Sequence, residues 1–417
     1  MSGVVENRSR CSLFAMAAVS AALAFSSMRV AAQSIGERPP LSVETSQYDR
    51  LDFPDEQVGI RAGLFQLYPS AAVSMAYDSN LFATAQARDE EALSVSEALL
   101  HLETDSEQVR FESEAFARAR RFLDVADQNT TEYGASASID TDLTARDGLS
   151  GRLLAQRRFE SRIEIETPNS RQVSFYKESR GDLSHLHTFN RFSLRTSVGG
   201  RRVDYEEGSQ RFRDRYSYNG ALRGAYLLRN GIALLGTAYY RQDQYRFVTP
   251  SIPSAETSGY QLGARMEIPE LLEFELSSGV FQRNFDQNLG STSGVSIRGG
   301  VTWYPTRLTT VRADIVREDA PTRIVGAFGK IRTNAAVEIT HEYSRRLNFY
   351  MRGRMIVDDF NTIQRTDKTY LTQLGAVCLL SRMYVVAAEY DYATRNSASV
   401  GDTFVRHVTS LSLLARF

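Results

Sequence analysis

The last residues of the chain alternate between two chemical environments. Phe417, Leu413 and Leu411 fall on one mainly apolar face, whereas Arg416 and Arg406 fall on the other. A strand places successive side chains on opposite faces, so a period of two predicts a β-strand between an apolar and a polar environment. A final strand that stops on an aromatic residue is typical of outer-membrane barrels, and we assign the assembly signal to Leu411, Leu413 and Phe417.

The first residues predict a secretory signal peptide. Arg8 and Arg10 precede an apolar run over 13–25, and residues 30–32 are small enough for a cleavage site. An uncleaved transmembrane helix is the alternative, but the run is short and rich in Ala and Ser for spanning ~30 Å of hydrocarbon. We therefore expect residues 1–32 to be removed, residues 33–66 to form a periplasmic lead-in, and residues 67–417 to form an outer-membrane β-barrel.

The rest of the chain has no uninterrupted apolar stretch of the roughly 20 residues that a spanning helix needs. A membrane protein without such a helix must close a barrel, because backbone groups cannot stay unpaired in lipid. Alternating runs predict an all-β, antiparallel, up-and-down transmembrane barrel of about eighteen strands, with sixteen as the alternative count. We place the strands at 70–78, 93–104, 107–118, 130–144, 149–160, 172–186, 190–204, 214–228, 231–245, 257–268, 271–285, 292–304, 307–318, 326–343, 346–358, 367–380, 383–395 and 403–417.

The predicted connections alternate in length along the chain. Short turns such as 147–148 and 381–382 separate longer links such as 161–171 and 246–256. Short turns on one rim and longer loops on the other indicate a bacterial outer-membrane barrel, and an even strand count brings both termini to the periplasmic rim. A soluble sandwich or propeller does not need this apolar alternation on every strand. No link is clearly long enough for a constriction loop, and 246–256 is the best candidate.

The charged faces of the strands predict a water-filled lumen. An Arg against lipid at the membrane midplane costs ~2–4 kcal/mol, so the charged faces must point inward, and a barrel of this size is wide enough for a channel. The expected lumen-lining residues are Arg110, Glu112, Arg312, Asp314, Arg332, Glu338, Arg352, Arg354, Asp358, Glu389 and Asp391. Pairs such as Arg332 with Glu338, or Arg352 and Arg354 with Asp358, either form a polar track or neutralise one another across strands.

No motif predicts an enzyme. The five histidines are scattered, and no nucleophile elbow, His-Glu-x-x-His helix or phosphate-binding glycine loop occurs. His185 and His187 share a strand face, but two nitrogens make a poor metal site. We expect no catalytic residue, metal or cofactor. The near balance of 49 basic and 50 acidic residues predicts no nucleic-acid partner, and Cys378 alone forms no intrachain disulfide.

The segments 59–65, 68–69 and 77–82, with Tyr77-Asp78-Ser79-Asn80-Leu81-Phe82, resemble the opening signature of the putative β-barrel porin 2 family of outer-membrane proteins. That resemblance implies export of an extracellular polysaccharide, with the polysaccharide as substrate and a periplasmic export protein as partner. The other expected partners are outer-membrane lipid, lipopolysaccharide and the barrel-insertion machinery, although Ala415 stands where that machinery usually reads an aromatic. The physics of a wet barrel alone favours a diffusion porin for small solutes, general or selective. A structural barrel closed by its loops is the third alternative.

Overall fold

The computed structural model describes residues 59–86, 88–104, 106, 108–163, 172–247, 252–287, 289–322, 324 and 326–417, which belong to one compact unit. The predicted signal peptide and most of the predicted lead-in lie outside the described residues. The strands are β1 (Ile60–Ala62), β2 (Phe65–Asp78), β3 (Glu91–Thr104), β4 (Val109–Phe122), β5 (Thr130–Asp142), β6 (Asp147–Phe159), β7 (Phe175–Phe189), β8 (Phe192–Tyr205), β9 (Arg215–Arg229), β10 (Ile232–Tyr245), β11 (Ala255–Ile268), β12 (Leu272–Phe285), β13 (Ser291–Thr306), β14 (Thr309–Ala320), β15 (Lys330–Ser344), β16 (Leu347–Phe360), β17 (Thr366–Leu379), β18 (Tyr384–Ser397) and β19 (Phe404–Arg416).

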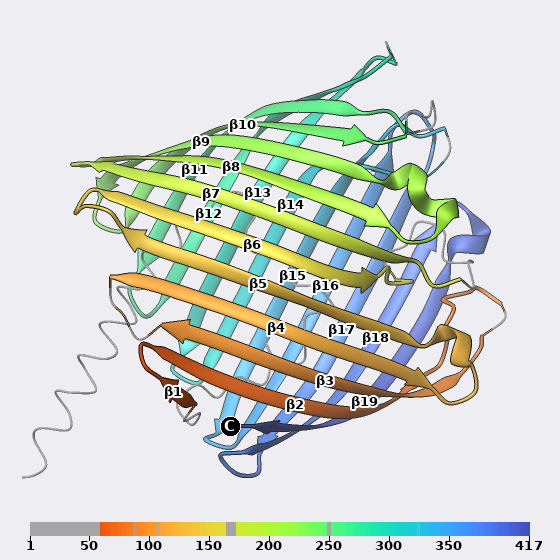
Figure 1. The fold of residues 1–417 in the computed structure, drawn as a ribbon. Coiled ribbons are helices and arrows are strands. Elements are labelled where there is room, and N and C mark those ends of the chain that lie inside the picture. Colours follow the sequence, from red (N-terminus) through yellow and green to blue (C-terminus); the bar gives the residue numbers. More distant parts are fainter. Residues whose placement is uncertain are drawn as a thin grey trace, which may run out of the picture. The chain divides into compact units, whose positions relative to one another are not determined.

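Eighteen strands close into an antiparallel barrel. Each strand from β2 to β18 pairs with the next along the chain, and β19 returns to β2 through pairs from Val408↔Asp78 to Arg416↔Ser70. The strands of the two walls cross in Figure 1, as expected for strands tilted to a barrel axis. The short β1 pairs with the start of β2. The predicted fold and strand count are therefore confirmed. The first strand of the barrel, β2, starts at Phe65, before residue 70, where the sequence analysis placed its start.

The two rims of the barrel differ in their connections. The β9–β10 turn is Asn230-Gly231, where Gly231 adopts a φ of +77°, a conformation that suits glycine in a tight turn. The β6–β7 link, in contrast, spans 160–174. Short 3-10 helices lie in three of the longer links: η3 (Ala126–Gln128), η4 (Gly208–Arg213) and η5 (Val400–Asp402). No helix in the described part of the chain is long and apolar enough to cross a membrane.

The two faces of each strand differ as the alternation predicts. On β2 the apolar Val73 and Met75 are exposed, whereas Ser74 and Asp78 between and beyond them are buried. The same pattern recurs on β16, where Met351 is exposed between the buried Tyr350 and Arg352. In a barrel the buried polar face is the inner one, so the apolar side chains form the outer surface.

Candidate functional site in the barrel lumen

The predicted lumen residues all fall on the inward parity of their strands. They are Arg110 and Glu112 on β4, Arg312 and Asp314 on β14, Arg332 and Glu338 on β15, Arg352, Arg354 and Asp358 on β16, and Glu389 and Asp391 on β18. Their role in solute passage stays a prediction. The predicted assembly residues Leu411, Leu413 and Phe417 lie on the outer face and are exposed.

One polar row crosses the inner wall from β14 to β18. Arg312, Glu338, Arg352, Gln373 and Asp391 are successive pair partners on neighbouring strands, and we call them the lumen row. Nε of Arg352 donates to Oε2 of Glu338 at 2.8 Å, and Nε2 of Gln373 donates to Oδ1 of Asp391 at 2.6 Å. At the end of the row, Nη1 of Arg312 lies 3.8 Å from Oε1 of Glu338. Sequence reasoning missed Gln373 because only charged residues were considered.

The lumen row is interrupted between Arg352 and Gln373. Nη1 of Arg352 and Oε1 of Gln373 are both buried, and neither has a hydrogen-bond partner in the described part of the chain. Both residues line a small cavity together with Ile163. A buried polar atom without a partner costs ~1–3 kcal/mol. A group that both donates and accepts, such as a hydroxyl, matches this donor and acceptor.

The ion pairs join neighbouring strands and differ from the pairs expected along the sequence. Nε of Arg332 lies 2.7 Å from Oδ1 of Asp358, whereas Glu338 accepts a hydrogen bond from Arg352. Nε of Arg354 donates to Oδ1 of Asn334 at 2.7 Å. Of the two alternatives, neutralisation across neighbouring strands is seen for Arg332 with Asp358 and for Arg352 with Glu338, while the charges close in sequence are not the partners observed. Cβ atoms directly opposite in a sheet are only ~4.5–5.5 Å apart, which favours partners across strands.

A second charged row lies on β3, β4 and β5. Glu97, Arg118 and Glu132 are successive pair partners, with Nη2 of Arg118 2.9 Å from Oε1 of Glu97. Nη1 of Arg120 lies 2.5 Å from Glu132, and Nε of Arg158 lies 3.3 Å from it. The Glu132 side chain is only 1% exposed. Three guanidinium groups thus surround the buried carboxylate of Glu132. The sequence analysis did not select Glu132, although alternation along its strand predicts that it points inward.

A buried cluster on β10, β12 and β14 contradicts the simple alternation. Asp319 is odd-numbered on a strand whose even residues point inward, yet it accepts from Arg241, from Nη1 of Arg283 at 2.5 Å and from Oγ1 of Thr257 at 2.9 Å. Arg283 also donates to Oδ2 of Asp243 at 3.1 Å. The β13–β14 ladder ends at the pair Ile297↔Arg317. The end of β14 is therefore free of β13, which allows the carboxylate to turn inward.

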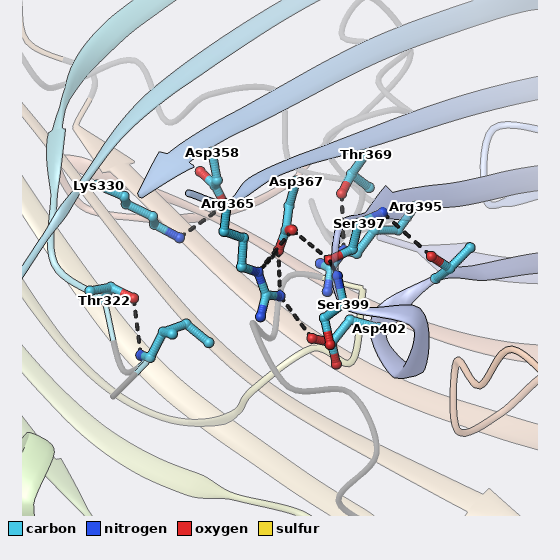
Figure 2. Close-up of polar contacts among 12 residues, drawn as sticks. Thr322, Lys330, Asp358, Arg365, Asp367, Thr369, Arg395, Ser397, Ser399 and Asp402 are labelled. Atoms are coloured by element: carbon cyan, nitrogen blue, oxygen red, sulfur yellow. Dashed lines mark hydrogen bonds and ion pairs between the residues drawn. The ribbon is translucent and has the colours of Figure 1, made fainter. Parts of the chain in front are cut away.

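A polar network lies where β17 and β18 meet the longer links, as Figure 2 shows. Nη2 of Arg365 donates to Oδ2 of Asp367 at 2.7 Å and to Oδ2 of Asp402 at 2.8 Å. Oγ of Ser397 donates to Oδ1 of Asp367 at 2.6 Å. Burial lowers the pKa of Arg365, but its hydrogen bonds to the two carboxylates outweigh that effect and raise the pKa overall. This network ties the β16–β17 link to η5.

The described start of the β6–β7 link, residues 160–163, extends over the barrel lumen. Nη2 of Arg162 donates to Oε1 of Gln128 at 2.5 Å, and its guanidinium lies 4.7 Å from the ring centre of Phe82. The carbonyl of Ile163 accepts a hydrogen bond from Arg395 on β18, six strands away around the ring. Burial, and then the charge of a nearby arginine, lowers the pKa of Arg162 to about 10. Residues 160–163 thus form an inward segment that the sequence did not single out. The expected candidate 246–256 stays a prediction, because residues 248–251 lie outside the described residues.

Beneath this link lies a cavity of about 220 Å³. Its lining includes Glu97, Arg118, Arg162, Ile163 and Asp391. Both charged rows therefore contribute to one chamber, which is also lined by Arg162 and Ile163 of the link and by strands from both ends of the sequence. The chamber is smaller than the ~300–1,000 Å³ of typical drug-sized sites.

A glycine permits a long contact on the inner wall next to the lumen row. Tyr350 on β16 hydrogen-bonds through its hydroxyl to Glu389 on β18, across the intervening β17. Gly375 on β17 is the pair partner of Tyr350, and a Cβ there would lie 2.2 Å from the tyrosine ring. Only a residue without a side chain leaves room for the ring.

The two neighbouring histidines contact a carboxylate near the short-turn rim. Nδ1 of His187 lies 2.6 Å and Nε2 of His185 lies 3.2 Å from Oδ1 of Asp147. No group of three or more His, Cys, Asp or Glu side chains within the described ranges is arranged to hold a metal ion.

A closed barrel of eighteen antiparallel strands, apolar outside and charged inside, defines the porin-like channels of outer membranes. The chain belongs to the family described as Putative beta-barrel porin 2, whose profile matches residues 53–417. The resemblance found in the sequence is confirmed, and the chain is a porin-like outer-membrane barrel. A search of curated proteins finds no match.

Several solved barrels are similar in structure. Pseudomonas aeruginosa OpdK, crystallised with vanillate, is 9% identical with a TM-score of 0.46, and the match covers 84% of this chain and 99% of OpdK. Acinetobacter baumannii OccAB2 is 10% identical with a TM-score of 0.46, covering 86% and 99% of the two chains. The siderophore receptor PirA of Pseudomonas aeruginosa is 12% identical with a TM-score of 0.43, covering 84% and 80%. Similarity at this level identifies no solute for this chain.

Proposed function

We propose that the protein is a selective diffusion channel for small polar solutes. The rim of short turns and both chain termini would face the periplasm. The rim of longer links would face the outside of the cell, because this asymmetry is usual in bacterial outer-membrane barrels. The residues that select solutes are Arg352 and Gln373, at the interruption of the lumen row, and those of the chamber beneath the described start of the β6–β7 link.

The single observation that carries the proposal is the contact between Ile163, at the described start of the β6–β7 link, and β18. Ile163 leaves β6 and hydrogen-bonds to Arg395 on β18, and it packs against the buried Ile356, Leu371 and Phe404. A polymer passing the mouth would have to displace this apolar packing, whereas a small solute could pass beside it. The lumen therefore favours small-solute diffusion over the polysaccharide export that the family resemblance implied.

The interrupted lumen row indicates the chemistry of the solute. Nη1 of Arg352 offers a donor and Oε1 of Gln373 an acceptor, both buried and both without partners among the described residues. Hydroxyl groups supply the complementary acceptor and donor at once. We therefore expect hydroxyl-bearing solutes, such as mono- and disaccharides, to pass more readily than apolar molecules of the same size.

Liposome swelling with sugars of increasing size tests the proposal. Purified barrel in liposomes should admit monosaccharides, admit disaccharides more slowly and exclude long oligosaccharides. Arg352→Gln should change the rate for sugars, because it alters the donor at the interruption. Arg312→Gln in the same row should change it little, because the Arg312 side chain is already 57% exposed. Absence of sugar-driven swelling, combined with loss of surface polysaccharide when the gene is deleted, would instead establish export.

A further inference from the structure

The outer surface carries two belts of exposed aromatic residues with aliphatic residues between them. Near the rim of short turns are Phe65, Phe189, Phe192, Tyr226, Trp303, Tyr343, Phe349, Tyr384 and Phe417. Nearer the rim of longer links are Tyr77, Tyr133, Tyr218, Tyr240, Tyr260 and Tyr370. Aromatic girdles mark the two interfaces of the membrane. Outward side chains between the second belt and the rim of longer links therefore lie at the level of lipid headgroups.

Basic side chains gather on one side of the barrel at the second belt and between it and the rim of longer links. We call the following residues, on β4, β6, β7 and β8 and just after β10, the basic patch: Arg121, Arg157, Lys177, Arg202 and Arg246. They share the outward parity of exposed apolar residues such as Leu153 and Val198. An arginine or lysine held against hydrocarbon is costly, so such positions are favourable only beside polar headgroups.

The centre of the basic patch is a pair of like charges on adjacent strands. Arg157 and Lys177 are direct pair partners, an arrangement that is destabilising by itself. Glu206 relieves only part of this repulsion, with Oε2 2.8 Å from Nη2 of Arg157 and Oε1 3.5 Å from Nζ of Lys177. The Arg157 guanidinium lies 4.0 Å from the ring centre of Phe175, which fixes its position. The Lys177 side chain stays 62% exposed, so its ammonium group can bind an external anion.

The basic patch is continuous on both sides of this pair. Nη2 of Arg121 donates to the hydroxyl of Thr131 at 3.2 Å, and Nη1 of Arg157 donates to the carbonyl of the same residue at 2.5 Å. On the other side, Arg202 and Arg246 both contact Asp204, at 2.5 and 2.9 Å. Arg246 also lies 3.8 Å from Oδ2 of Asp214. The patch thus sets five cations against three carboxylates, Asp204, Glu206 and Asp214, which leaves an excess of positive charge.

The remaining outer wall is different at the same level. Outward strand residues of β11 to β18 near the rim of longer links carry Arg317 and Lys368 against Glu256 and Asp359. Nη1 of Arg317 lies 3.9 Å from Oδ2 of Asp359. Positive and negative charges balance there, so the excess is a property of one sector and not of the whole rim.

We propose that the basic patch binds the phosphate groups of the anionic glycolipid of the outer leaflet. The inference rests on the orientation proposed above, in which the longer links face outward. Phosphate matches the patch because guanidinium groups bind it bidentately and the ammonium of Lys177 binds it as a point charge. The tyrosine belt borders the patch, with Tyr133 the pair partner of Arg157, and it marks the level where the acyl chains begin. One sector of the barrel thus holds a lipid at a fixed place.

Binding of purified lipid A to barrel refolded in an uncharged detergent tests the proposal. The triple variant Arg157→Gln, Lys177→Gln and Arg202→Gln should bind lipid A on the order of 100-fold more weakly, because each cation near an anionic lipid surface contributes about one decade or slightly less. The matched control Arg317→Gln with Lys368→Gln should bind like wild type. Dephosphorylated lipid A should bind both variants and wild type equally weakly, and inorganic phosphate should compete poorly.

Other results would overturn the proposal. Unchanged binding by the triple variant, equal weakening in the control, or no effect of removing the phosphates would each exclude a phosphate site in the patch. Equally tight binding of inorganic phosphate would indicate a free-anion site instead. Sugar-driven swelling is measured on the same folded preparations in liposomes without lipid A. Loss of swelling with lipid A binding intact refutes the channel alone, whereas the reverse refutes the lipid site alone.

Discussion

Removing one carboxylate from the buried lumen cluster is the sharpest test of how dry the inner wall is. Asp319→Asn keeps the size of the side chain but leaves Arg241 and Arg283 sharing a single carboxylate, that of Asp243. Asp319 is 3% exposed and Arg283 is 1% exposed. Breaking a buried ion pair by removing one partner typically costs ~3–5 kcal/mol. We therefore expect Asp319→Asn to lower the free energy of unfolding by about 3–5 kcal/mol.

Urea unfolding in liposomes, followed by tryptophan fluorescence, measures this loss. Arg312→Gln is the matched control, because it removes an ion pair of 3.8 Å in the same lumen whose arginine is largely exposed. Exposed pairs contribute about 0–1 kcal/mol, so the control should unfold almost like wild type. A loss below about 1 kcal/mol for Asp319→Asn would show that water solvates the cluster and would refute the argument from burial.

Three further predictions follow from single contacts. Gly375→Val should displace the ring of Tyr350 and break its contact with the carboxylate of Glu389. The variant should therefore have a lower melting temperature than wild type, and a heat-modifiability gel measures that temperature. The pKa of Glu206 is lowered chiefly by its hydrogen bond from Arg157. The stabilisation by this contact is therefore present above the ordinary glutamate pKa of 4.5 and lost as the pH falls through the lowered value, so Glu206→Gln should abolish this part of the acid dependence of the melting temperature. Removing Phe417 should reduce the amount of folded barrel in the outer membrane without changing the stability of the barrel refolded in detergent, and equal reduction of both would assign Phe417 a structural role.

The strands and their faces were readable because a strand has a simple period. Met351 outward and Arg352 inward follow from alternation alone, and so does the outward position of Leu411 and Leu413 on the last strand. The energetic cost of a charge in lipid then decides which face is the inner one. The count of eighteen strands and the difference between the two rims could be predicted from the positions of the short turns in the sequence.

The side-chain contacts between adjacent strands could not be predicted from the sequence, because they depend on the register in which the strands pair. Glu338 pairs with Arg352 and not with Arg332, since residues directly opposite on adjacent strands are the nearest neighbours. Gln373 entered the lumen row for the same reason, as the pair partner of Arg352.

The sequence by itself determined an eighteen-stranded barrel with an apolar outside and a charged inside, because alternation and the cost of buried charge are local properties. The tertiary structure alone decided which segment extends over the lumen and what the inner charges contact. Ile163 reaches β18, and Asp319 turns against its parity, because closure of the ring brings together residues far apart in the chain and frees the end of one strand from its neighbour.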